Sequence, residues 1–548
     1  MRVGIRMPGL LIVGAAVAGM GFAVAQGGLW KLGGQNIENT RYQAAETKIG
    51  VANANTLAVK WALSTEGDVS ATPAVDGQAV YFPDWKGYLY AADRNTGQIL
   101  WKTAIQDYTG VPAQGPPEQG SMPGGVVRAT PVVVGDLLLM GDQGGRLAQG
   151  AKVFAVNRKT GALVWMTQVQ GNGADGSDTS FGAQFAMVTQ PVIVDANNPN
   201  VAYVGTAGWE EAMAALIPGY QCCSFRGTVV ALNTQTGAVL WRTYTTPEGY
   251  SGAGVWGSSG SLDASRKILY VTTGNNYSVP AEVGDCIAAA GTDEDEQRAC
   301  LSPGNHVDSI LAINIQTGAI RWAMQALPFD TWNVACILPW FGNPCPQPTG
   351  PDYDFAQGPT LFTAKVNGKN RQIVGAGQKS GHYWAVDRDT GEVLWKTQVG
   401  PGGTLGGLQW GSATDGNRIY VAVNNNDGAS WTPVGQSQPT TSGAWGALDP
   451  GTGAILWQTP VPVTDPGFGA AAGPLSVANG VVYGCTSLGK FTALNAQTGA
   501  VLWTFDSGRN TCASGAAISQ GMVFWGTGYN QIKFAAIEPS TVSAFSTK

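Results

Sequence analysis

Hydrophobic and polar residues alternate in short runs along most of this chain, and one spacing recurs seven times. Each copy reads alanine, any residue, Asp or Asn, two residues, Thr-Gly, three residues and tryptophan. The copies end at Trp101, Trp165, Trp241, Trp322, Trp395, Trp457 and Trp503. The gaps between copies vary while the internal spacing does not, which indicates one structural unit repeated with insertions.

Residues 480–505 show most compactly what one unit is. Gly480-Val-Val-Tyr-Gly and Phe491-Thr-Ala-Leu-Asn are short alternating runs, and Val501-Leu-Trp-Thr-Phe follows Thr498-Gly. Such runs, separated by Gly and Asn, predict antiparallel strands. The Asx-x-x-Thr-Gly segment predicts a tight turn, because the Asx side chain bonds nearby backbone and Gly adopts positive φ. The tryptophan falls on the last strand, where we expect its ring to pack on the neighbouring unit.

Four short strands per unit, stacked around an axis, predict an all-β fold: an eight-bladed β-propeller with Trp-docking repeats. Seven units carry the full pattern. An eighth is degenerate, because Gly521-Met-Val-Phe-Trp-Gly and Phe534-Ala-Ala-Ile-Glu are followed by no Thr-Gly and no final Trp. We expect the segment around Leu29-Trp30 to supply the missing outer strand, so that both chain ends close blade 8. A seven-bladed ring with an atypical tail is the alternative.

The first residues predict an export signal. A positively charged start precedes the apolar run 10–24, and the small residues Ala23-Val-Ala predict cleavage near Ala25. We therefore expect a signal peptide (1–25) and a single propeller domain (26–548). No later stretch is long and apolar enough to span a bilayer. These features predict an exported, periplasmic protein without a transmembrane segment.

The formal net charge of −6, with no basic stripe, argues against a nucleic-acid partner. The eight cysteines fit an oxidising compartment. We expect six of them to pair across one insertion or between adjacent blades: Cys286 with Cys300, Cys336 with Cys345, and Cys485 with Cys512. The adjacent Cys222 and Cys223 either form a vicinal disulfide, which we favour, or bond to other partners. No Cys-x-x-Cys-His occurs, so we expect no covalent c-type haem.

Long insertions cluster on one face of a propeller, and we expect the functional site there. The large insertions are residues 107–127, 166–183, 209–226, 277–306, 328–358 and 424–443. The two histidines, His306 and His382, are far apart and have no partners at ligand spacing, so neither a zinc site nor a Ser-His-Asp triad is expected. No Gly-x-Gly-x-x-Gly follows a strand, so a Rossmann-type nucleotide site is not expected.

Three blade-start motifs add to the repeat: Gly208-Trp-Glu-Glu, Cys222-Cys-Ser-Phe-Arg-Gly and Gly375-Ala-Gly-Gln-Lys-Ser-Gly. Together with the repeat they resemble the quinoprotein alcohol dehydrogenases, and most closely the polyvinyl-alcohol-dehydrogenase-like branch. The resemblance covers essentially the whole mature chain. It implies an eight-bladed propeller that binds pyrroloquinoline quinone (PQQ) on its central axis. The tryptophan repeat alone also occurs in non-enzymatic relatives, including outer-membrane assembly propellers.

The resemblance implies a pocket for a flat o-quinone that carries three carboxylates. Arg128, in Val-Val-Arg-Ala-Thr-Pro, would pair with a carboxylate. Lys379 would contact the quinone oxygens, and Thr189, in Val-Thr-Gln-Pro, would bond the cofactor. Trp256, in Gly-Val-Trp-Gly, would form the floor on which the ring stacks, and the adjacent cysteines would supply the opposing face.

The resemblance also implies a calcium ion (Ca2+) beside the quinone, held by hard oxygen ligands. Glu210, or its neighbour Glu211, matches the family's ligating glutamate. Asn275, in Thr-Gly-Asn-Asn-Tyr, matches its ligating asparagine. The ion would polarise the quinone carbonyl as a Lewis acid.

Two positions depart from the family's pattern. Ser70 stands where a glutamate of the first blade is expected. Asp330-Thr-Trp-Asn stands where the family's line ends in the catalytic aspartate, and Asn333 cannot accept a proton. Asp330 is the nearest carboxylate, and Asp352 and Asp354 follow in the same insertion. Either one of these takes over as the base, or alcohol oxidation has been lost while the cofactor pocket remains.

The leading prediction is a periplasmic PQQ-dependent alcohol dehydrogenase with Asp330 as the base and Lys379 assisting hydride transfer. Electrons would pass one at a time to a separate soluble cytochrome c, because the chain has no haem motif. A secondary-alcohol polymer such as polyvinyl alcohol is the substrate that the resemblance suggests. The alternatives are a non-catalytic scaffold of the outer-membrane assembly type, which Asn333 favours, and a PQQ-binding sensor without turnover.

Overall fold

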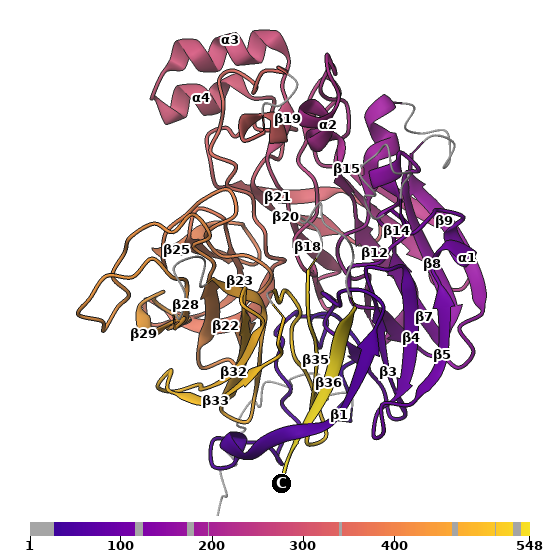
Figure 1. The fold of residues 1–548 in the computed structure, drawn as a ribbon. Helices are drawn as coiled ribbons and strands as arrows, with labels where there is room; N and C mark the ends of the chain where they lie inside the picture. The colour runs from indigo at the N-terminus through magenta and orange to yellow at the C-terminus, as the bar shows by residue number, and fades with distance from the viewer. Residues whose placement is uncertain are drawn as a thin grey trace, which may run out of the picture.

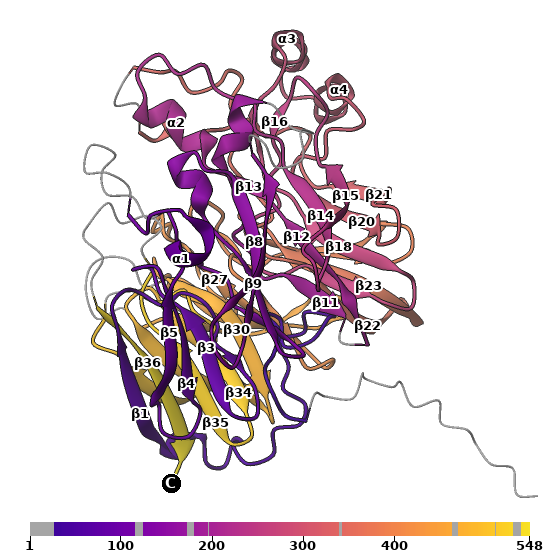
Figure 2. The same ribbon diagram turned by 90° about the vertical axis from the view of Figure 1, so that its right-hand side faces the viewer.

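The computed structural model describes residues 27–114, 124–171, 180–195, 197–338, 342–462, 470–509, 511–529 and 539–548. These residues form eight four-stranded sheets, each one blade of a β-propeller. Figures 1 and 2 show the blades side by side around a ring. The predicted all-β, eight-bladed propeller is confirmed, and the seven-bladed alternative is wrong. The predicted signal peptide and its cleavage near Ala25 lie outside the described residues.

The strands of each blade pair antiparallel in chain order. Blade 1 contains β2 (Ala74–Val75), β3 (Ala79–Pro83), β4 (Tyr88–Asp93) and β5 (Ile99–Ala104). Blade 2 contains β6 (Val132–Val134), β7 (Leu137–Gly141), β8 (Ala151–Asn157) and β9 (Leu163–Gln170). Blade 3 contains β11 (Ile193–Asp195), β12 (Asn198–Gly205), β14 (Thr228–Asn233) and β15 (Val239–Tyr244). Blade 4 contains β17 (Ser261–Asp263), β18 (Ile268–Thr272), β20 (Ser309–Asn314) and β21 (Ile320–Gln325).

The second half of the ring repeats this order. Blade 5 contains β22 (Thr360–Val366), β23 (Lys369–Gly377), β24 (His382–Asp387) and β25 (Val393–Gln398). Blade 6 contains β26 (Ala413–Thr414), β27 (Ile419–Val423), β28 (Ala444–Leu448) and β29 (Ile455–Pro460). Blade 7 contains β30 (Ala471–Ala478), β31 (Val481–Thr486), β32 (Lys490–Asn495) and β33 (Val501–Asp506). Blade 8 contains β34 (Ala517–Ser519), β35 (Met522–Gly526), β36 (Ser540–Thr547) and, from the other end of the chain, β1 (Leu57–Thr65).

Blade 8 closes the ring by pairing the two ends of the chain. Strand β1 runs antiparallel to β36, with Leu57 opposite Thr547 and Thr65 opposite Ser540. The prediction that an N-terminal segment completes this blade is right, but the segment named for it is wrong. Trp30 forms a bridge to Val75 of blade 1 instead.

The repeated tryptophans join each blade to the next. The indole Nε1 of Trp165 donates a hydrogen bond to the carbonyl of Thr234 (2.8 Å), in the turn of the following blade. A Cβ atom placed at Gly237 of that turn would lie 2.5 Å from the Trp165 ring, so only glycine lets the ring pack there. The same indole bond recurs around the ring, from Trp101 to Arg158, Trp241 to Ile315, Trp322 to Arg388, Trp395 to Pro450, Trp457 to Ala496 and Trp503 to Leu57.

Trp61 on β1 completes this series as an eighth docking tryptophan. Its Nε1 donates to the carbonyl of Arg94 in blade 1 (2.9 Å), and its ring lies against Gly97. The sequence pattern did not identify it, because the strand that carries it is far in the chain from the rest of blade 8. The predicted packing of each tryptophan on a neighbouring unit is confirmed.

Residues 30–43, here called the axial belt, cross the ring along the first strand of nearly every blade. Five belt carbonyls accept backbone hydrogen bonds in blade order: Lys31 from Val133, Ile37 from Leu262, Glu38 from Leu361, Thr40 from Thr414 and Arg41 from Val477. The belt also pairs with Val75 at its beginning, and the Gln43 side chain donates to the Ile518 carbonyl of blade 8 at its end. The belt therefore fastens the inner edges of the blades to one another.

Arg41 fixes the end of the belt at the axis. Its guanidinium is buried and donates to the carbonyls of Leu475 (2.5 Å) and Gly33 (2.7 Å) and to the hydroxyl of Thr72 (3.1 Å). These partners belong to blade 7, to the belt itself and to the start of blade 1. One side chain thus links the two sides of the ring's closure.

The helices and two small sheets lie outside the blades. The helices are α1 (Gln106–Thr109), α2 (Glu210–Leu216), α3 (Ala281–Ala290) and α4 (Glu294–Cys300), with short 3-10 turns η1 (Ala54–Thr56), η3 (Gly144–Leu147), η4 (Phe181–Phe185) and η5 (Val334–Cys336). The small sheets pair β10 (Ala186–Met187) with β13 (Ala207–Gly208), and β16 (Ser251–Gly252) with β19 (Asn276–Ser278). Helices α2, α3 and α4 gather at one end of the molecule, at the top of Figures 1 and 2. No helix among the described residues has the length and apolar character needed to cross a membrane.

All four predicted disulfides form. Cys286–Cys300 joins α3 to α4, Cys336–Cys345 closes the loop after η5, and Cys485–Cys512 links blade 7 to blade 8. Cys222 and Cys223 are bonded to each other, so the vicinal alternative is the correct one.

Arg41→Ala should destabilise the closed ring, because it removes the hydrogen bonds that the guanidinium donates as well as its packing. The substitution leaves buried carbonyls without their charged donor, and we expect the free energy of unfolding to fall by about 3 kcal/mol. Urea denaturation measures this value. Lys31→Ala is the control, because Lys31 contributes only its backbone carbonyl to the belt, and it should change stability by less than about 0.5 kcal/mol. Equal effects of the two substitutions would show that Arg41 does not fasten the ring.

Candidate functional site

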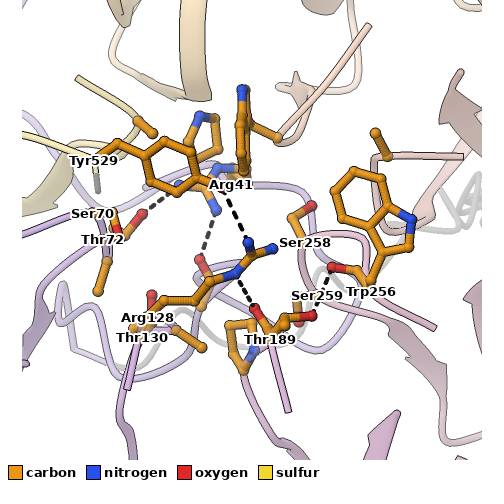
Figure 3. A pocket seen from close by; sticks show the side chains of 18 residues that line it. Arg41, Ser70, Thr72, Arg128, Thr130, Thr189, Trp256, Ser258, Ser259 and Tyr529 are labelled. Atoms are coloured by element: carbon orange, nitrogen blue, oxygen red, sulfur yellow. Dashed lines mark hydrogen bonds between the residues drawn. The ribbon is translucent and has the colours of Figure 1, made fainter. Parts of the chain in front are cut away.

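A cavity of about 240 Å³, here called the main cavity, opens where the blade starts meet α2 and η5. A smaller chamber of about 70 Å³, here called the inner chamber, lies between it and the axial belt and is drawn in Figure 3. Five residues line both: Arg128, Thr189, Trp256, Trp410 and Tyr529. The two spaces therefore form one channel along the axis.

Arg128 lies at the junction of the two spaces. Its Nε donates to the Thr189 carbonyl (3.2 Å), and its Nη1 donates to the Tyr529 hydroxyl (3.1 Å). Its guanidinium also lies 5.9 Å from the centre of the Trp410 ring. No carboxylate of the described residues forms an ion pair with Arg128. A cation held by neutral partners in a channel wall is suited to bind an anionic group of a ligand.

Trp256 is fixed on two sides. Its Nε1 donates to Asp354 Oδ2 (3.0 Å), and its carbonyl accepts a hydrogen bond from the Thr189 hydroxyl (3.2 Å). The Lys379 ammonium lies 5.3 Å from the centre of the indole ring. These contacts hold a flat aromatic surface against the channel, as Figure 3 shows for Trp256 and Thr189.

The Lys379 ammonium is buried between two carboxylates. Its Nζ lies 2.9 Å from Asp352 Oδ1 and 2.8 Å from Asp354 Oδ2. The two anions raise the pKa of Lys379 in spite of the burial that opposes its charge. The lysine is therefore a permanent cation in the cavity wall.

The Asp354 carboxylate lines the main cavity and is held by three donors. Its Oδ1 accepts from the backbone N–H of Asn275 (2.5 Å), while Oδ2 accepts from Trp256 and from Lys379. Each carboxylate oxygen has two acceptor positions, so these bonds leave Asp354 able to accept from the cavity as well. The sequence pattern placed Asp354 only among the nearby alternatives to Asp330.

Asn275 presents its side-chain carbonyl to the main cavity. Both amide hydrogens are used inside the wall, because Nδ2 donates to the carbonyls of Asn276 (2.9 Å) and Trp332 (2.8 Å). The orientation of the amide is thus set by two backbone acceptors, which leaves Oδ1 as the atom available to a ligand. Its predicted place at the site agrees with this geometry.

The glutamate that faces the cavity is Glu211, whereas Glu210 faces away. The Glu210 carboxylate accepts from the backbone N–H groups of Ser224 (2.8 Å) and Phe225 (2.6 Å) and from the Tyr220 hydroxyl (2.8 Å). Glu211 lines the main cavity, and no hydrogen bond or ion pair to its carboxylate is found within the described residues. Burial, reinforced by the charge of Asp354, raises the pKa of Glu211 to about 8. Of the two neighbours that the sequence analysis named for the ligand role, Glu211 is the one that lines the main cavity, and the ligand role itself stays a prediction.

The vicinal disulfide lies behind the cavity wall. Neither Cys222 nor Cys223 is among the described residues that line the main cavity, and their predicted part as the opposing face of the cofactor site stays a prediction. Cys222 Sγ lies 3.8 Å from Asn333 Nδ2, while Asn333 Oδ1 accepts from the backbone N–H of Ala335 (2.9 Å) and caps η5. Asn333 thus has a structural role at the position where the resemblance predicted a catalytic aspartate.

Asp330 does not reach the main cavity either. It is fully buried, and its two oxygens accept from the backbone N–H groups of Asp352 (3.1 Å) and Tyr353 (2.6 Å). Burial raises its pKa to about 7. In this position the side chain holds the backbone that carries Asp352 and Asp354, and the catalytic role predicted for Asp330 stays a prediction.

The inner chamber is lined with hydroxyl groups and carries no carboxylate in its described lining. Ser70 accepts a hydrogen bond from Trp85 Nε1 (2.9 Å), so its own hydroxyl hydrogen is free to donate. Thr72, Thr130 and Ser258 line the same space (Figure 3). With Ser70 at the position where the resemblance predicted a glutamate, the described lining of the inner chamber offers hydroxyl groups and the guanidinium groups of Arg41 and Arg128, without a carboxylate.

The residues present fit both PQQ and a calcium ion. A flat aromatic surface, two cations and several hydroxyl donors match an aromatic ring that carries carboxylates and quinone oxygens. The unpartnered carboxylate of Glu211 and the directed carbonyl of Asn275 are hard oxygen ligands of the kind that calcium prefers. The described residues contain no group of three or more His, Cys, Asp or Glu side chains suited to a metal, so these two would bind an ion together with other oxygens.

Trp410 and Tyr529 were missed by the sequence reasoning. Trp410 had a recognisable signal, since Gln409-Trp-Gly-Ser at the start of blade 6 matches Val255-Trp-Gly-Ser at the start of blade 4. Tyr529 had none, because it lies in the degenerate eighth unit. Both aromatic rings belong to the channel wall and contact each other at 5.1 Å between centroids.

Known proteins with similar sequences and a similar fold are found for this chain. A family model described as outer membrane protein assembly factor BamB matches residues 38–216 and 379–543. A polyvinylalcohol dehydrogenase of Sphingopyxis sp. (strain 113P3) is 28% identical over 532 residues, covering 90% of this chain and 71% of that protein. A second polyvinylalcohol dehydrogenase, from Pseudomonas sp, is 26% identical over 539 residues, covering 91% and 73%. The solved structure of a quinohemoprotein alcohol dehydrogenase from Comamonas testosteroni has the same fold, with a TM-score of 0.69 at 19% identity over 96% of this chain and 81% of that one.

Glu211 should make the stability of the apo chain depend on pH. Between the ordinary glutamate pKa and about 8, the folded chain keeps a proton that the unfolded chain has lost. The contribution of this proton is therefore complete at low pH and disappears as the pH rises through that window. Relative to Glu211→Gln, the wild-type chain should lose about 1.4 kcal/mol of unfolding free energy per pH unit there. Urea denaturation of both proteins between about pH 5 and 8 measures this difference, and a difference that stays constant would show that the carboxyl is not held in its protonated form.

Proposed function

The chain belongs to the PQQ_2 family of propeller repeats, and on that premise we propose that it is a PQQ-dependent alcohol dehydrogenase. The observation that supports this most strongly is the joint placement of Trp256, Lys379 and Asp354 in one cavity wall. It supplies a stacking surface, a cation and a base within direct contact of one another. The relatives that carry the name polyvinylalcohol dehydrogenase support the same conclusion.

The cofactor would be held along the axial channel. Arg128, together with Thr189 and the hydroxyl groups of the inner chamber, would bind carboxylates. Trp256 would support the ring, and Lys379 would donate to the quinone oxygens. PQQ, when bound, supplies the two-electron acceptor for alcohol oxidation.

Asp354 is the base in this proposal. An alcohol hydroxyl in the main cavity would donate its proton to the Asp354 carboxylate. The Lys379 ammonium stabilises the negative charge of that carboxylate before the transfer, and Trp256 and the Asn275 backbone fix its orientation. Asn333 is not the base in this proposal, because an amide cannot accept the proton. Its side chain caps η5 instead.

Calcium would be bound by Glu211 and Asn275 on the same side of the main cavity. The ion would supply a Lewis acid beside the quinone. It would also offset the negative charge that Glu211 and Asp354 concentrate there, which is the repulsion that contributes to the raised pKa of Glu211.

The substrate would be an alcohol, and a secondary-alcohol polymer such as polyvinyl alcohol is the one that the named relatives favour. The outer part of the main cavity supports a carbon chain, since Leu216, Val334, Ile337, Leu338 and Leu405 line it. Electrons would pass to a separate protein such as a soluble cytochrome c, and the enzyme would act in the periplasm.

A non-catalytic scaffold of the outer-membrane assembly type is the alternative function, because the matching family model carries that description. The family model matches the repeats on either side of residues 217–378. The residues between these matches include Trp256, Asn275, Asp352 and Asp354, which form much of the cavity wall. A scaffold needs the docking tryptophans but has no use for a lysine buried with two carboxylates.

Reconstitution with PQQ and calcium tests the proposed activity. The loaded chain should reduce a dye electron acceptor with secondary alcohols, and Asp354→Asn should lower kcat by at least roughly 100-fold while the quinone absorption of the bound cofactor remains. Asp330→Asn is the comparison, because Asp330 supports the backbone from behind the wall, and it should keep at least roughly tenfold more activity than Asp354→Asn.

Three other outcomes of this experiment would contradict the proposal. Failure of the wild-type chain to bind PQQ would refute the cofactor site and favour the scaffold. Binding without turnover of any alcohol would indicate a sensor. Activity that survives in Asp354→Asn and disappears in Asp330→Asn would return the role of base to Asp330.

A further inference from the structure

The main cavity contains one buried lysine for two buried aspartates, and only one of those aspartates has a role in the proposed reaction. Lys379 Nζ is 2.9 Å from Asp352 Oδ1 and 2.8 Å from Asp354 Oδ2. The three side chains are nearly fully buried, so these contacts are shielded from solvent and are far stronger than surface ion pairs. Asp352 is the aspartate that has no role in the proposed reaction.

Asp352 is held in place by a dedicated backbone arrangement. It has a φ of 60°, in the left-handed region that aspartate tolerates better than most residues. The Asp330 carboxylate accepts from the N–H groups of both Asp352 and Tyr353, which fixes this turn from behind. Asp352 Oδ2 is buried and has no hydrogen-bond partner among the described residues, so the backbone arrangement serves the contact of Oδ1 with Lys379.

The position of Asp352 determines where the lysine ammonium lies. With Asp354 alone, the flexible lysine side chain would be free to move fully onto that carboxylate, because a single carboxylate would attract the whole charge. A second carboxylate on the other side holds the ammonium between the two. Lys379 then remains at the cavity wall near the Trp256 ring, and Asp354 keeps an acceptor position toward the cavity.

We propose that Asp352 is a positioning residue for alcohol oxidation, which acts on the reaction only through Lys379 by holding its ammonium between Asp352 and Asp354. This inference rests on the proposed function, since it assigns to Lys379 the contact with the cofactor. It also gives Asp330 a place in the same chain of contacts, as the residue that sets the backbone of Asp352.

A double-mutant cycle tests this assignment in the loaded enzyme. Asp352→Asn should lower kcat by roughly tenfold and leave KM and the quinone absorption of bound PQQ within about twofold of wild type. Lys379→Met should lower kcat by roughly 100-fold. The double variant should match Lys379→Met within about twofold, because Asp352 has nothing to position once the ammonium is gone. Effects that multiply in the double variant would overturn the proposal.

The same cycle in the apo chain supplies a measurement that does not depend on the cofactor. Asp352→Asn and Lys379→Met should each lower the urea midpoint of unfolding, and the double variant should unfold at a higher urea concentration than the sum of the two shifts predicts. Independent shifts would show that the two side chains are not coupled. Asp142→Asn is the matched control, since Asp142 is a buried aspartate of blade 2 outside both cavities, and its shift should add to that of Lys379→Met.

The two levels of the proposal fail in different ways. If the wild-type chain does not bind PQQ, the proposed function is refuted, and coupling in the apo chain still shows whether Asp352 holds Lys379. If PQQ binds and alcohol is oxidised but the kinetic effects of Asp352→Asn and Lys379→Met multiply, the function stands and the positioning role is refuted.

Discussion

Closure of the ring is the constraint on which the rest of this structure depends. Eight blades surround one axis only if each blade meets its neighbour at the same angle, and the indole of one docking tryptophan per blade supplies that contact. The hydrogen bond from Nε1 fixes the ring, and the glycine of the following turn gives it a flat surface. The axial belt adds a second fastening at the inner edges, with Arg41 at the point where the ends of the ring meet.

The chemistry follows from this closure, because it brings the starts of separate blades to one channel. Arg128 precedes blade 2, Trp256 precedes blade 4, and Asp354 precedes blade 5, yet all three lie in the same wall. No two of them are close in sequence. Charges that would be costly to bury singly are buried here as a group, since Lys379 lies between Asp352 and Asp354. The ring thus provides rigidity, while the segments that connect its strands provide the glutamate, the asparagine and the apolar residues of the cavity.

The sequence predicted the ring well and the site only partly, for physical reasons. The rigid Thr-Gly to Trp spacing follows from local turn geometry and docking, so it is visible in any one copy. Trp61 and the axial belt were missed because their roles arise only when distant parts of the chain meet. Glu210 and Glu211 illustrate the same limit: two adjacent glutamates at the start of α2 point in different directions, and only the backbone N–H groups of Ser224 and Phe225 reveal which one is already used. Asp330 was preferred to Asp354 as the base because it is the carboxylate nearest to Asn333 in sequence, and only the fold shows that Asp330 is fully buried while Asp354 lines the cavity.

The central claim is that the axial channel binds PQQ through a stacking surface and buried cations. Calorimetric titration of PQQ into the apo chain with calcium present tests it most directly. The account predicts one binding site per chain, with affinity that falls at least roughly tenfold in Trp256→Ala and in Arg128→Met, while Trp431→Ala, a tryptophan outside both cavities, leaves it unchanged. Tight binding that is indifferent to Trp256 and Arg128 would place the cofactor elsewhere and contradict the account.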